Sequence, residues 1–215
     1  MNHYSCEKIT DRIYMIVARY GPHSNVMQLL LGDTRAAIID TGMGVTGNVR
    51  KVAETVTDLP IDCFLTHMHP DHAGASMLFD KRYMNPADEI HCWWALTKEK
   101  RKMDMEDVFS VEPDLEERID NEIIDDSGFS YIPIENEQIF DLGGVTLQVL
   151  SARGHTPGSV VYYCKEENAV FGGDAVSPKI SLFSEHDITF AAFKDSYEDI
   201  LNIKKVCNAG TKFFC

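Results

Sequence analysis

The chain has 215 residues and a formal net charge of −14, with 44% hydrophobic and 25% charged residues. These values are ordinary for a folded protein and predict a single domain over residues 1–215, with ample length for a core. The strong negative charge argues against nucleic-acid binding, which uses basic stripes, and no apolar run reaches the length of a membrane span.

The amino-terminal segment and the cysteines indicate in which cellular compartment the protein is expected. Residues 1–12 are polar and charged and contain no apolar stretch of a signal peptide, so we expect a cytoplasmic protein. The six cysteines are scattered and form no C-x-x-C pair. This spacing favours reduced thiols over a framework of disulfides.

The first part of the chain alternates strands with helices. Apolar runs bounded by turn residues predict strands at residues 13–18, 24–31, 36–40 and 61–66. Valines at helical spacing predict a helix over 45–57, which Pro60 ends, and a second helix is expected over 71–79.

The second half repeats this style after a less regular middle. Helices are expected over 87–105 and 111–124, in a region that we expect to shape substrate access. Later strands are predicted at 129–134, 138–141, 145–151, 160–164 and 169–171. A helix at 195–208 is followed by the start of another strand at 211–215. Two packed sheets with helices outside, an α/β fold with four αββα layers, would satisfy this order.

A dense group of potential metal ligands follows the strand at 61–66, in the run Thr66-His67-Met68-His69-Pro70-Asp71-His72. Imidazole nitrogens suit zinc and iron, and carboxylates serve either metal. His67 and His69 are two residues apart and can face the same way in an extended turn. Asp71 and His72 are adjacent, so their side chains diverge. One segment can therefore serve two neighbouring metals.

This run resembles the H-x-H-x-D-H signature of the metallo-β-lactamase-fold hydrolase superfamily. Three more segments match that family in its order: Asp40-Thr41-Gly42, Gly154-His155-Thr156-Pro157-Gly158-Ser159 and Gly172-Gly173-Asp174. The glyoxalase II-like thioesterases are the nearest branch, through T-H-x-H-x-D-H and G-H-T-P-G-S. The resemblance implies the four-layer αββα sandwich, a fold that hosts many chemistries.

The resemblance also implies six metal ligands, which are His67, His69 and His155 for one metal, Asp71 and His72 for a second, and Asp174 as the bridge. The family usually adds a histidine in a Gly-His turn after a late strand, and the sequence contains no such turn. We therefore expect that the chain is truncated before this ligand or that its second site is weak. His186 precedes the last helix and is not assigned this role.

The implied cofactor is zinc, with two ions expected and iron or manganese as alternatives. The expected reaction is attack by a metal-bound hydroxide on a small-molecule ester, thioester, lactone or amide, without nucleic-acid or membrane partners. Asp71 is the expected catalytic residue, accepting a proton from water or donating one to the leaving group. Asp40 either orients a ligand histidine or stabilises the turn before Gly42.

Two other classes of function stay open. Met68 stands where di-iron relatives that reduce oxygen carry glutamate, which argues against that branch. A persulfide dioxygenase-like oxidoreductase with a single iron would need only His67, His155 and Asp174. A non-catalytic metal-binding scaffold is the other alternative. The remaining histidines, His3, His23 and His91, lie outside any ligand pattern, although the loop of His23 could approach the cleft.

Overall fold

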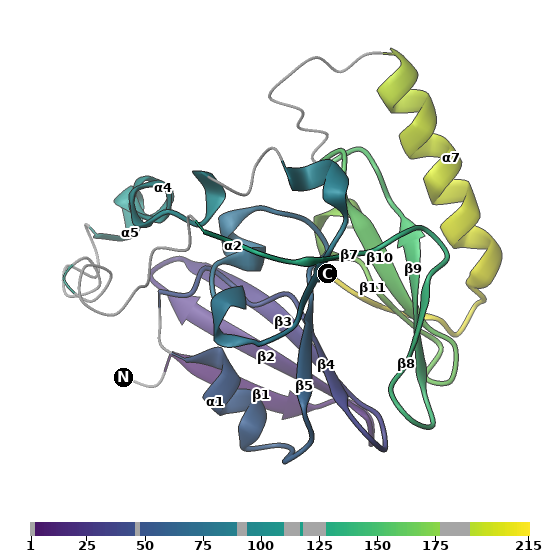
Figure 1. Ribbon diagram of the computed structural model, residues 1–215, viewed down its shortest axis with the longest axis horizontal. Helices are drawn as coiled ribbons and strands as arrows, with labels where there is room; N and C mark the ends of the chain where they lie inside the picture. The colour runs from purple at the N-terminus through teal and green to yellow at the C-terminus, as the bar shows by residue number, and fades with distance from the viewer. Residues whose placement is uncertain (1–2, 46–47, 90–93, 110–116, 118–127, 177–189) are drawn as a thin grey trace.

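Two β-sheets lie face to face at the centre of the computed structural model, which describes residues 3–45, 48–89, 94–109, 117, 128–176 and 190–215 (Figure 1). Helices α1, α2, α4 and α5 lie on the side of the first sheet, and α7 covers the other side. The predicted α/β class with two packed sheets and helices outside is confirmed.

The first sheet has seven strands in the order of the sequence. Their bounds are β1 (Tyr4–Lys8), β2 (Ile13–Tyr20), β3 (His23–Leu31), β4 (Ala36–Ile39), β5 (Ile61–Phe64), β6 (Arg82–Met84) and β7 (Ile132–Pro133). The first four strands pair antiparallel, and the pairs from β4 to β7 are parallel. The carboxyl ends of β4, β5 and β6 therefore meet at one edge of the sheet.

The second sheet has five strands in the order β12-β11-β10-β9-β8. Their bounds are β8 (Ile139–Asp141), β9 (Thr146–Ser151), β10 (Val160–Cys164), β11 (Ala169–Phe171) and β12 (Lys212–Phe214). β12 pairs in parallel with β11, and the other neighbours are antiparallel. The late strand that the sequence predicts at 211–215 is therefore present at the edge of this sheet.

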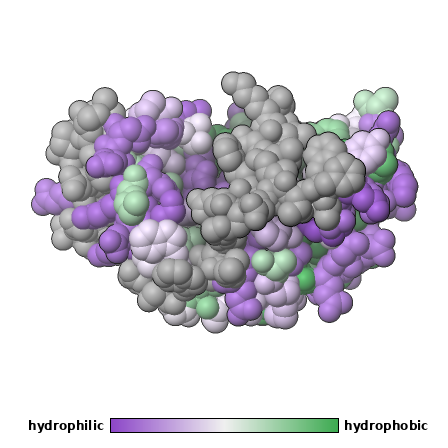
Figure 2. All heavy atoms as spheres, turned by 90° about the horizontal axis from the view of Figure 1, so that it is seen from above, coloured by the Kyte–Doolittle hydropathy of each residue, from purple (hydrophilic) through white to green (hydrophobic). Residues whose placement is uncertain are grey.

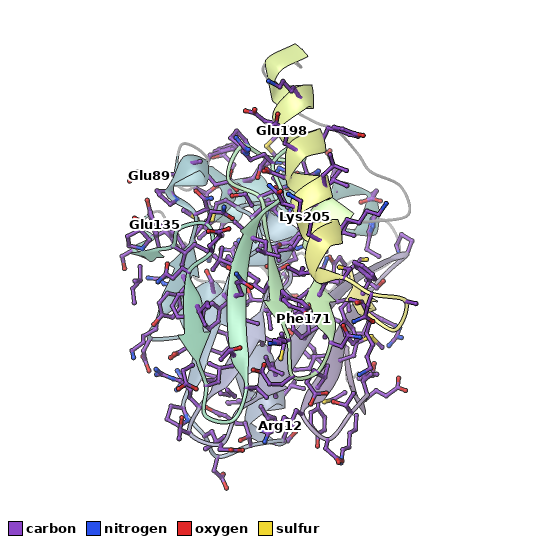
Figure 3. The ribbon with its side chains drawn as sticks, turned by 90° about the vertical axis from the view of Figure 1, so that its right-hand side faces the viewer. Arg12, Glu89, Glu135, Phe171, Glu198 and Lys205 are labelled. Carbon is purple, nitrogen blue, oxygen red and sulfur yellow. The ribbon has the colours of Figure 1, made fainter. Side chains whose placement is uncertain are left out.

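Three layers of apolar side chains hold the sandwich together. Neighbouring strand residues point to opposite faces, so Ile38 packs in the cluster that also contains α1 residues, whereas Ile39 packs between the sheets. Between the sheets, Phe64 stacks on Tyr83 with ring centroids 4.6 Å apart. On the far side, Ile203 of α7 (Phe190–Val206) joins the cluster on the outer face of the second sheet. Figure 3 shows this helix crossing in front of the strands.

The helices are shorter and more broken than the sequence predicts. The helix expected over 45–57 is α1 (Val49–Glu54), which begins where the Asn48 side chain accepts a hydrogen bond from the amide of Lys51. The helix expected over 71–79 is α2 (Pro70–Ala73) followed by the 3₁₀ helix η1 (Ser76–Leu78). Gly74 separates them.

Contacts around Gly74 explain this break. A Cβ atom at Gly74 would lie 2.2 Å from the carbonyl oxygen of Met43, so the chain approaches that backbone too closely for another residue. The carbonyl oxygen of Gly74 accepts a hydrogen bond from Arg101 Nη1 at 2.8 Å instead of continuing a regular helix. Arg101 is 1% exposed and lies on α4 (Lys98–Asp104), so this bond fixes α4 beside α2.

The middle of the chain differs most from the sequence prediction. Where one helix is expected over 87–105, the structure has the 3₁₀ helix η2 (Pro86–Asp88), α4 and then α5 (Glu106–Phe109). The helix expected over 111–124 falls, except for residue 117, outside the described residues. None of the described helices is long and apolar enough to cross a membrane. The described side chains visible from above are mostly hydrophilic (Figure 2).

Candidate metal centre

The candidate site lies at the carboxyl ends of parallel strands. Because β4 and β5 pair in parallel, Asp40 and the run 66–72, which follow them, emerge at the same edge. In the second sheet, His155 lies in the turn between β9 and β10. Asp174 lies in the 3₁₀ helix η3 (Gly173–Val176), which follows β11. Both halves of the chain therefore contribute side chains to one place.

Three imidazoles meet there. Nε2 of His67 lies 3.1 Å from Nδ1 of His69, and Nε2 of His155 lies 2.9 Å from the same Nδ1. One ring nitrogen from each residue lies within 4.8 Å of the other two. His67 and His155 are buried and His69 is half-buried. The structure thus brings together the three histidines that the resemblance assigns to the first metal.

Hydrogen bonds set the tautomer of His67. The hydroxyl of Thr66 donates its single proton to Oδ2 of Asp40 at 2.8 Å. The same hydroxyl oxygen lies 3.1 Å from Nδ1 of His67 and can there only accept, so Nδ1 carries the ring proton. The lone pair of Nε2 is left facing the other two imidazoles, which is the form that binds a metal.

A second group consists of His67, His72 and Asp174, whose ligand atoms also lie within 4.8 Å of one another. Nε2 of His72 lies 3.4 Å from Oδ1 of Asp174. The other oxygen of Asp174 lies 3.4 Å from Nε2 of His155. Asp174 therefore reaches both groups, which is the position that the resemblance implies for a bridging carboxylate.

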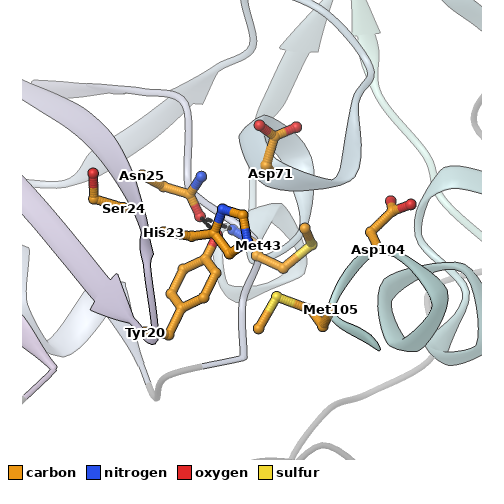
Figure 4. Close-up of a pocket in the computed structure, with 8 residues that line it drawn as sticks. All are labelled: Tyr20, His23, Ser24, Asn25, Met43, Asp71, Asp104 and Met105. Carbon is orange, nitrogen blue, oxygen red and sulfur yellow. Dashed lines mark hydrogen bonds between the residues drawn. The ribbon is translucent and has the colours of Figure 1, made fainter. Parts of the chain in front are cut away.

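Asp71 lies at the edge of the second group. Its Oδ2 is 3.7 Å from Nε2 of His72, and its side chain is 41% exposed. It also lines a pocket beside the site, shown in Figure 4. A half-exposed carboxylate in this place could exchange protons with water, and its role as a ligand and catalytic residue stays a prediction.

Burial and charge separate the protonation states of these histidines. Burial and the neighbouring imidazoles hold the pKa of His67 well below its ordinary value, and burial and His155 lower the pKa of His69 to about 4. Burial also disfavours charge on His72, but Asp40, Asp71 and Asp174 outweigh it and hold the pKa of His72 well above its ordinary value. A hydrogen bond with His72 lowers the pKa of Asp174. His67 and His69 are therefore neutral at neutral pH, as metal ligands must be, whereas a metal that binds His72 must displace a proton from its ring.

Asp40 connects the strand end to the second group. Its Oδ2 accepts a hydrogen bond from Nδ1 of His72 at 2.7 Å, and its Oδ1 accepts one from the amide of Thr66 at 2.8 Å. Its backbone is left-handed, with φ of 59°. Of the two interpretations that the sequence left open for Asp40, the geometry supports the first, because its carboxylate fixes the ring of His72.

Asp88 is a site residue that the sequence analysis missed. It is fully buried in η2, and its Oδ2 accepts from the amide of Met68 at 3.0 Å and from the hydroxyl of Thr156 at 2.8 Å. Its Oδ1 accepts from the amide of Gly158 at 2.6 Å. One carboxylate thus joins the loop of His67 and His69 to the loop of His155. The only signal in the sequence was an aspartate after Asn85-Pro86, a common start of a turn.

The other described histidines, His3 and His23, do not belong to the two groups. Nδ1 of His3 lies 3.0 Å from the carbonyl oxygen of Arg19. His23 forms an ion-pair contact with Asp107 at 2.8 Å and lines the same pocket as Asp71, so its loop does approach the site. His91 and His186 lie outside the described residues.

Comparison with known protein families identifies the family of this chain. The family model of the Metallo-beta-lactamase superfamily matches residues 20–205, which include every residue of both groups. The chain belongs to the metallo-beta-lactamase superfamily. Solved structures are similar in fold: a metallo-beta-lactamase family protein from Thermus thermophilus aligns over 93% of this chain and 71% of its own, with a TM-score of 0.66 and 18% identity. Metallo-beta-lactamase from Pontibacter korlensis covers 98% and 89%, with a TM-score of 0.65 and 17% identity.

Curated members of the superfamily are also similar in sequence. Lactamase-like protein aptB of Emericella nidulans is 26% identical, over 78% of this chain and 47% of its own length. The Atrochrysone carboxyl ACP thioesterase nsrC of Aspergillus novofumigatus is 28% identical, over 71% and 38%. Hydroxyacylglutathione hydrolase GloC of Haemophilus influenzae is 27% identical, over 67% and 62%. The match thus spans between 38% and 62% of the length of these relatives.

Proposed function

We propose that this member of the superfamily is a metal-dependent hydrolase of a small-molecule ester, thioester, lactone or amide. The observation that carries the proposal is the convergence of His67, His69 and His155 within 4.8 Å, with His72 and Asp174 alongside. These side chains come from both sheets, and burying several imidazole nitrogens that face one another is costly unless they bind a common partner.

The donor set fits a divalent cation. Nitrogen ligands at about 2.0–2.1 Å from a tetrahedral zinc ion lie about 3.3 Å apart. The ring nitrogens here are 3.1 and 2.9 Å apart, and Nε2 of His67 presents its lone pair. His67, His69 and His155 would hold one ion. Asp71 and His72 would hold the other, with Asp174 between the two.

When bound, zinc or a similar ion would lower the pKa of a coordinated water from about 15.7 towards about 7 and polarise a substrate carbonyl. The residues of the chain have separate tasks around it. Asp71, at the open edge, would accept a proton from the attacking water or pass one to the leaving group. Asp40 and Thr66 hold His72 and His67 in their orientations.

The relatives support hydrolysis at a carbonyl. Two of them are named as a thioesterase and as a hydroxyacylglutathione hydrolase, both of which cleave thioesters. We extend only this class of reaction to the present chain, because the two proteins are less than 30% identical to it.

Metal content on freshly purified protein, followed by turnover of a thioester, a lactone, a phosphoester and a β-lactam, tests the proposal. We expect zinc near two equivalents and turnover of a carbonyl substrate that chelation abolishes and added zinc restores. A protein that retains metal but hydrolyses no substrate would count against catalysis and favour a binding scaffold. One iron per chain with sulfur-dependent oxygen uptake would favour a dioxygenase instead.

A matched pair of variants tests the role of Asp71. Asp71→Asn should lower kcat at least about a hundredfold, the usual contribution of general acid–base catalysis. Asp107→Asn removes a carboxylate that pairs with His23 and lies outside the two ligand groups, so it should change kcat little. Full turnover by Asp71→Asn, with both metals retained, would exclude the proposed role.

A further inference from the structure

The ion pair between Arg153 and Asp199 connects the loop of His155 to α7. Nε and Nη2 of Arg153 donate to the two carboxylate oxygens of Asp199 at 2.7 and 2.9 Å. The backbone amide of Arg153 also donates to Oδ2 of Asp199, at 3.0 Å. Asp195, one turn earlier on α7, accepts a further hydrogen bond from Nη1 at 3.1 Å. One carboxylate of α7 therefore fixes both the side chain and the backbone of Arg153, two residues before a candidate metal ligand.

The helix that carries this carboxylate is packed against the second sheet. Ser196, Asp199 and Ile203 are three and four residues apart, so they share one face of α7, and they are 7%, 4% and 5% exposed. Ile203 belongs to the apolar cluster that also contains Leu150 and Val161 of the sheet. Figure 3 shows α7 lying across these strands. Asp199 is therefore part of a packed element, which can hold a partner more precisely than a loop can.

The residue between Arg153 and the ligand His155 is a glycine. Gly154 has φ of 140°, a value that other residues rarely adopt. A glycine permits this turn, but it also leaves the chain free to adopt other conformations, so the neighbouring residues must hold His155 in place. Asp88 holds the loop on the carboxyl-terminal side of His155. The ion pair of Arg153 holds it on the amino-terminal side.

The chemistry of this pair suits positioning. Asp199 loses its contact with water on burial, and its hydrogen bonds with Arg153 offset that cost. A buried ion pair adds little net stability compared with apolar side chains of similar size. The guanidinium donates as a planar fork, however, so the pair is satisfied in one relative arrangement of the loop and the helix.

On the basis of the metal centre proposed above, we propose that Arg153 and Asp199 are positioning residues, through which α7 holds the imidazole of His155 in place for the metal. Neither residue contacts the metal or the substrate, and both act through the backbone of the loop. Because the coupling between two sites is reciprocal, metal binding at His155 should also stabilise the docking of α7. The pair thus links occupancy of the metal centre to the order of a helix on the outer face of the sandwich.

A zinc titration of the full chain, in competition with a chelator, tests this role. Asp199→Asn should lower the zinc affinity of the site that contains His155 at least about tenfold. Glu198→Gln removes the same charge from the neighbouring, exposed position of α7, where the side chain pairs with Lys194 at 3.7 Å. Because exposed charges are screened, it should change the affinity by less than about twofold. Equal affinity in Asp199→Asn and the wild type, or an equal loss in both variants, would overturn the proposal.

Further variants separate positioning from a general loss of stability. Ile203→Val shortens a side chain on the same face of α7, so it should lower the urea midpoint of unfolding without lowering zinc affinity. Arg153→Met should lower the affinity as Asp199→Asn does, and Arg153→Lys, which keeps the charge but not the fork, should restore part of it. The double variant should lose no more than the weaker-binding single variant, because both remove one contact. Losses that add, or an equal loss in Ile203→Val, would overturn the positioning role.

The reciprocal effect on α7 can be measured by hydrogen exchange. In the wild type, zinc should slow exchange of the α7 amides at least about threefold more than that of the α1 amides, which lie beside the other sheet. Asp199→Asn should remove most of this difference, and Glu198→Gln should keep it. Equal protection of α7 by zinc in the wild type and Asp199→Asn would overturn the coupling.

The position of His155 can also be followed without metal. In metal-free protein with ¹³C-labelled histidine rings, the signal of His155 should shift or broaden in Asp199→Asn and stay unchanged in Glu198→Gln. If the wild type binds no zinc, or binds zinc without hydrolysing any substrate, the proposed function fails, whereas this signal still decides the positioning role. An unchanged signal of His155 in Asp199→Asn would overturn the proposal.

Discussion

Single carboxylates hold the candidate centre in shape. Asp88 accepts three hydrogen bonds that join the two histidine loops, and Asp40 fixes the ring of His72 and the chain at Thr66. Both are buried and lie next to the ligands rather than among them. Such neighbours usually influence metal affinity by orienting the ligands.

Replacing Asp88 should therefore affect stability and metal binding together. Asp88→Ala leaves the buried amides of Met68 and Gly158 without this acceptor, which should lower the free energy of unfolding by about 3 kcal/mol or more. Zinc affinity, measured by competition with a chelator, should fall at least about tenfold, with partial rescue in Asp88→Asn. Asp62→Asn removes a buried carboxylate paired with Arg35 at 2.9 Å and should lower stability without lowering zinc affinity. Equal zinc affinity in Asp88→Ala and the wild type would show a purely structural role.

Asp40→Asn should act mainly on the second metal, because Asp40 contacts His72 directly and reaches His67 only through Thr66. Asparagine tolerates the left-handed backbone that Asp40 adopts, so the turn should survive. The loss of charge beside His72 should weaken the second zinc about 10–100-fold while the first changes little. A zinc titration that resolves two affinities measures this, with Asp33→Asn, an exposed partner of Arg12, as control. Unchanged affinity at both sites would contradict the role given to Asp40.

At the level of elements, the strands were easier to predict than the helices. The predicted strands at 160–164 and 169–171 match β10 and β11, because each is a short apolar run that is buried on both faces. β1 was missed because its residues are mostly exposed and polar. The helix at 71–79 was predicted as continuous because its break depends on Met43 and Arg101, which are distant in sequence.

Contacts between residues distant in sequence also limited the prediction of the site. The resemblance to the family implied six ligand candidates, but Asp88 is 68 residues from Thr156 and 70 from Gly158, and no local pattern marks such contacts. Asp40 was singled out because it follows a strand in a recognisable turn. Its hydrogen bond with His72 could not be predicted from the sequence, because it depends on the parallel pairing of β4 and β5, which brings the two residues together.

The close packing of the short helix η3 can be tested by substituting a glycine. Gly173 has φ of 49°, and a Cβ atom there would lie 2.4 Å from Oγ1 of Thr66. Gly173→Ala should therefore displace η3 and lower the free energy of unfolding by about 2 kcal/mol or more, as strain and steric overlap add. Gly128→Ala, where no atom lies within 4 Å of the added Cβ, should change it by less than about 0.5 kcal/mol. Similar unfolding curves for both variants in urea would contradict the close packing of η3.

At the level of the whole molecule, the buried histidines predict how stability depends on pH. The pKa of His69 falls from about 6.5 in the unfolded chain to about 4 in the folded one, so the unfolded state binds more protons between these values. Stability therefore decreases as the pH falls through this window, and His67 acts in the same direction. His72 acts oppositely: its stabilisation is complete below about pH 6.5 and is lost as the pH rises through its higher folded pKa.

Chemical denaturation of the metal-free protein tests this dependence. From pH 7 to pH 4, His69 alone should remove up to about 3 kcal/mol of stability, at about 1.4 kcal/mol for each unit of pKa. His69→Gln should flatten the dependence, whereas His3→Gln, outside the cluster, should keep it. An unchanged slope in His69→Gln would show that this imidazole is not buried as described.

The central claim is that His67, His69 and His155 bind one metal ion between them. A crystal structure of the zinc-loaded protein, with anomalous diffraction recorded on both sides of the zinc absorption edge, tests it directly. We expect an anomalous peak about 2.0–2.1 Å from Nε2 of His67, Nδ1 of His69 and Nε2 of His155. Zinc-loaded crystals with no peak there, or with the zinc bound elsewhere, would contradict it.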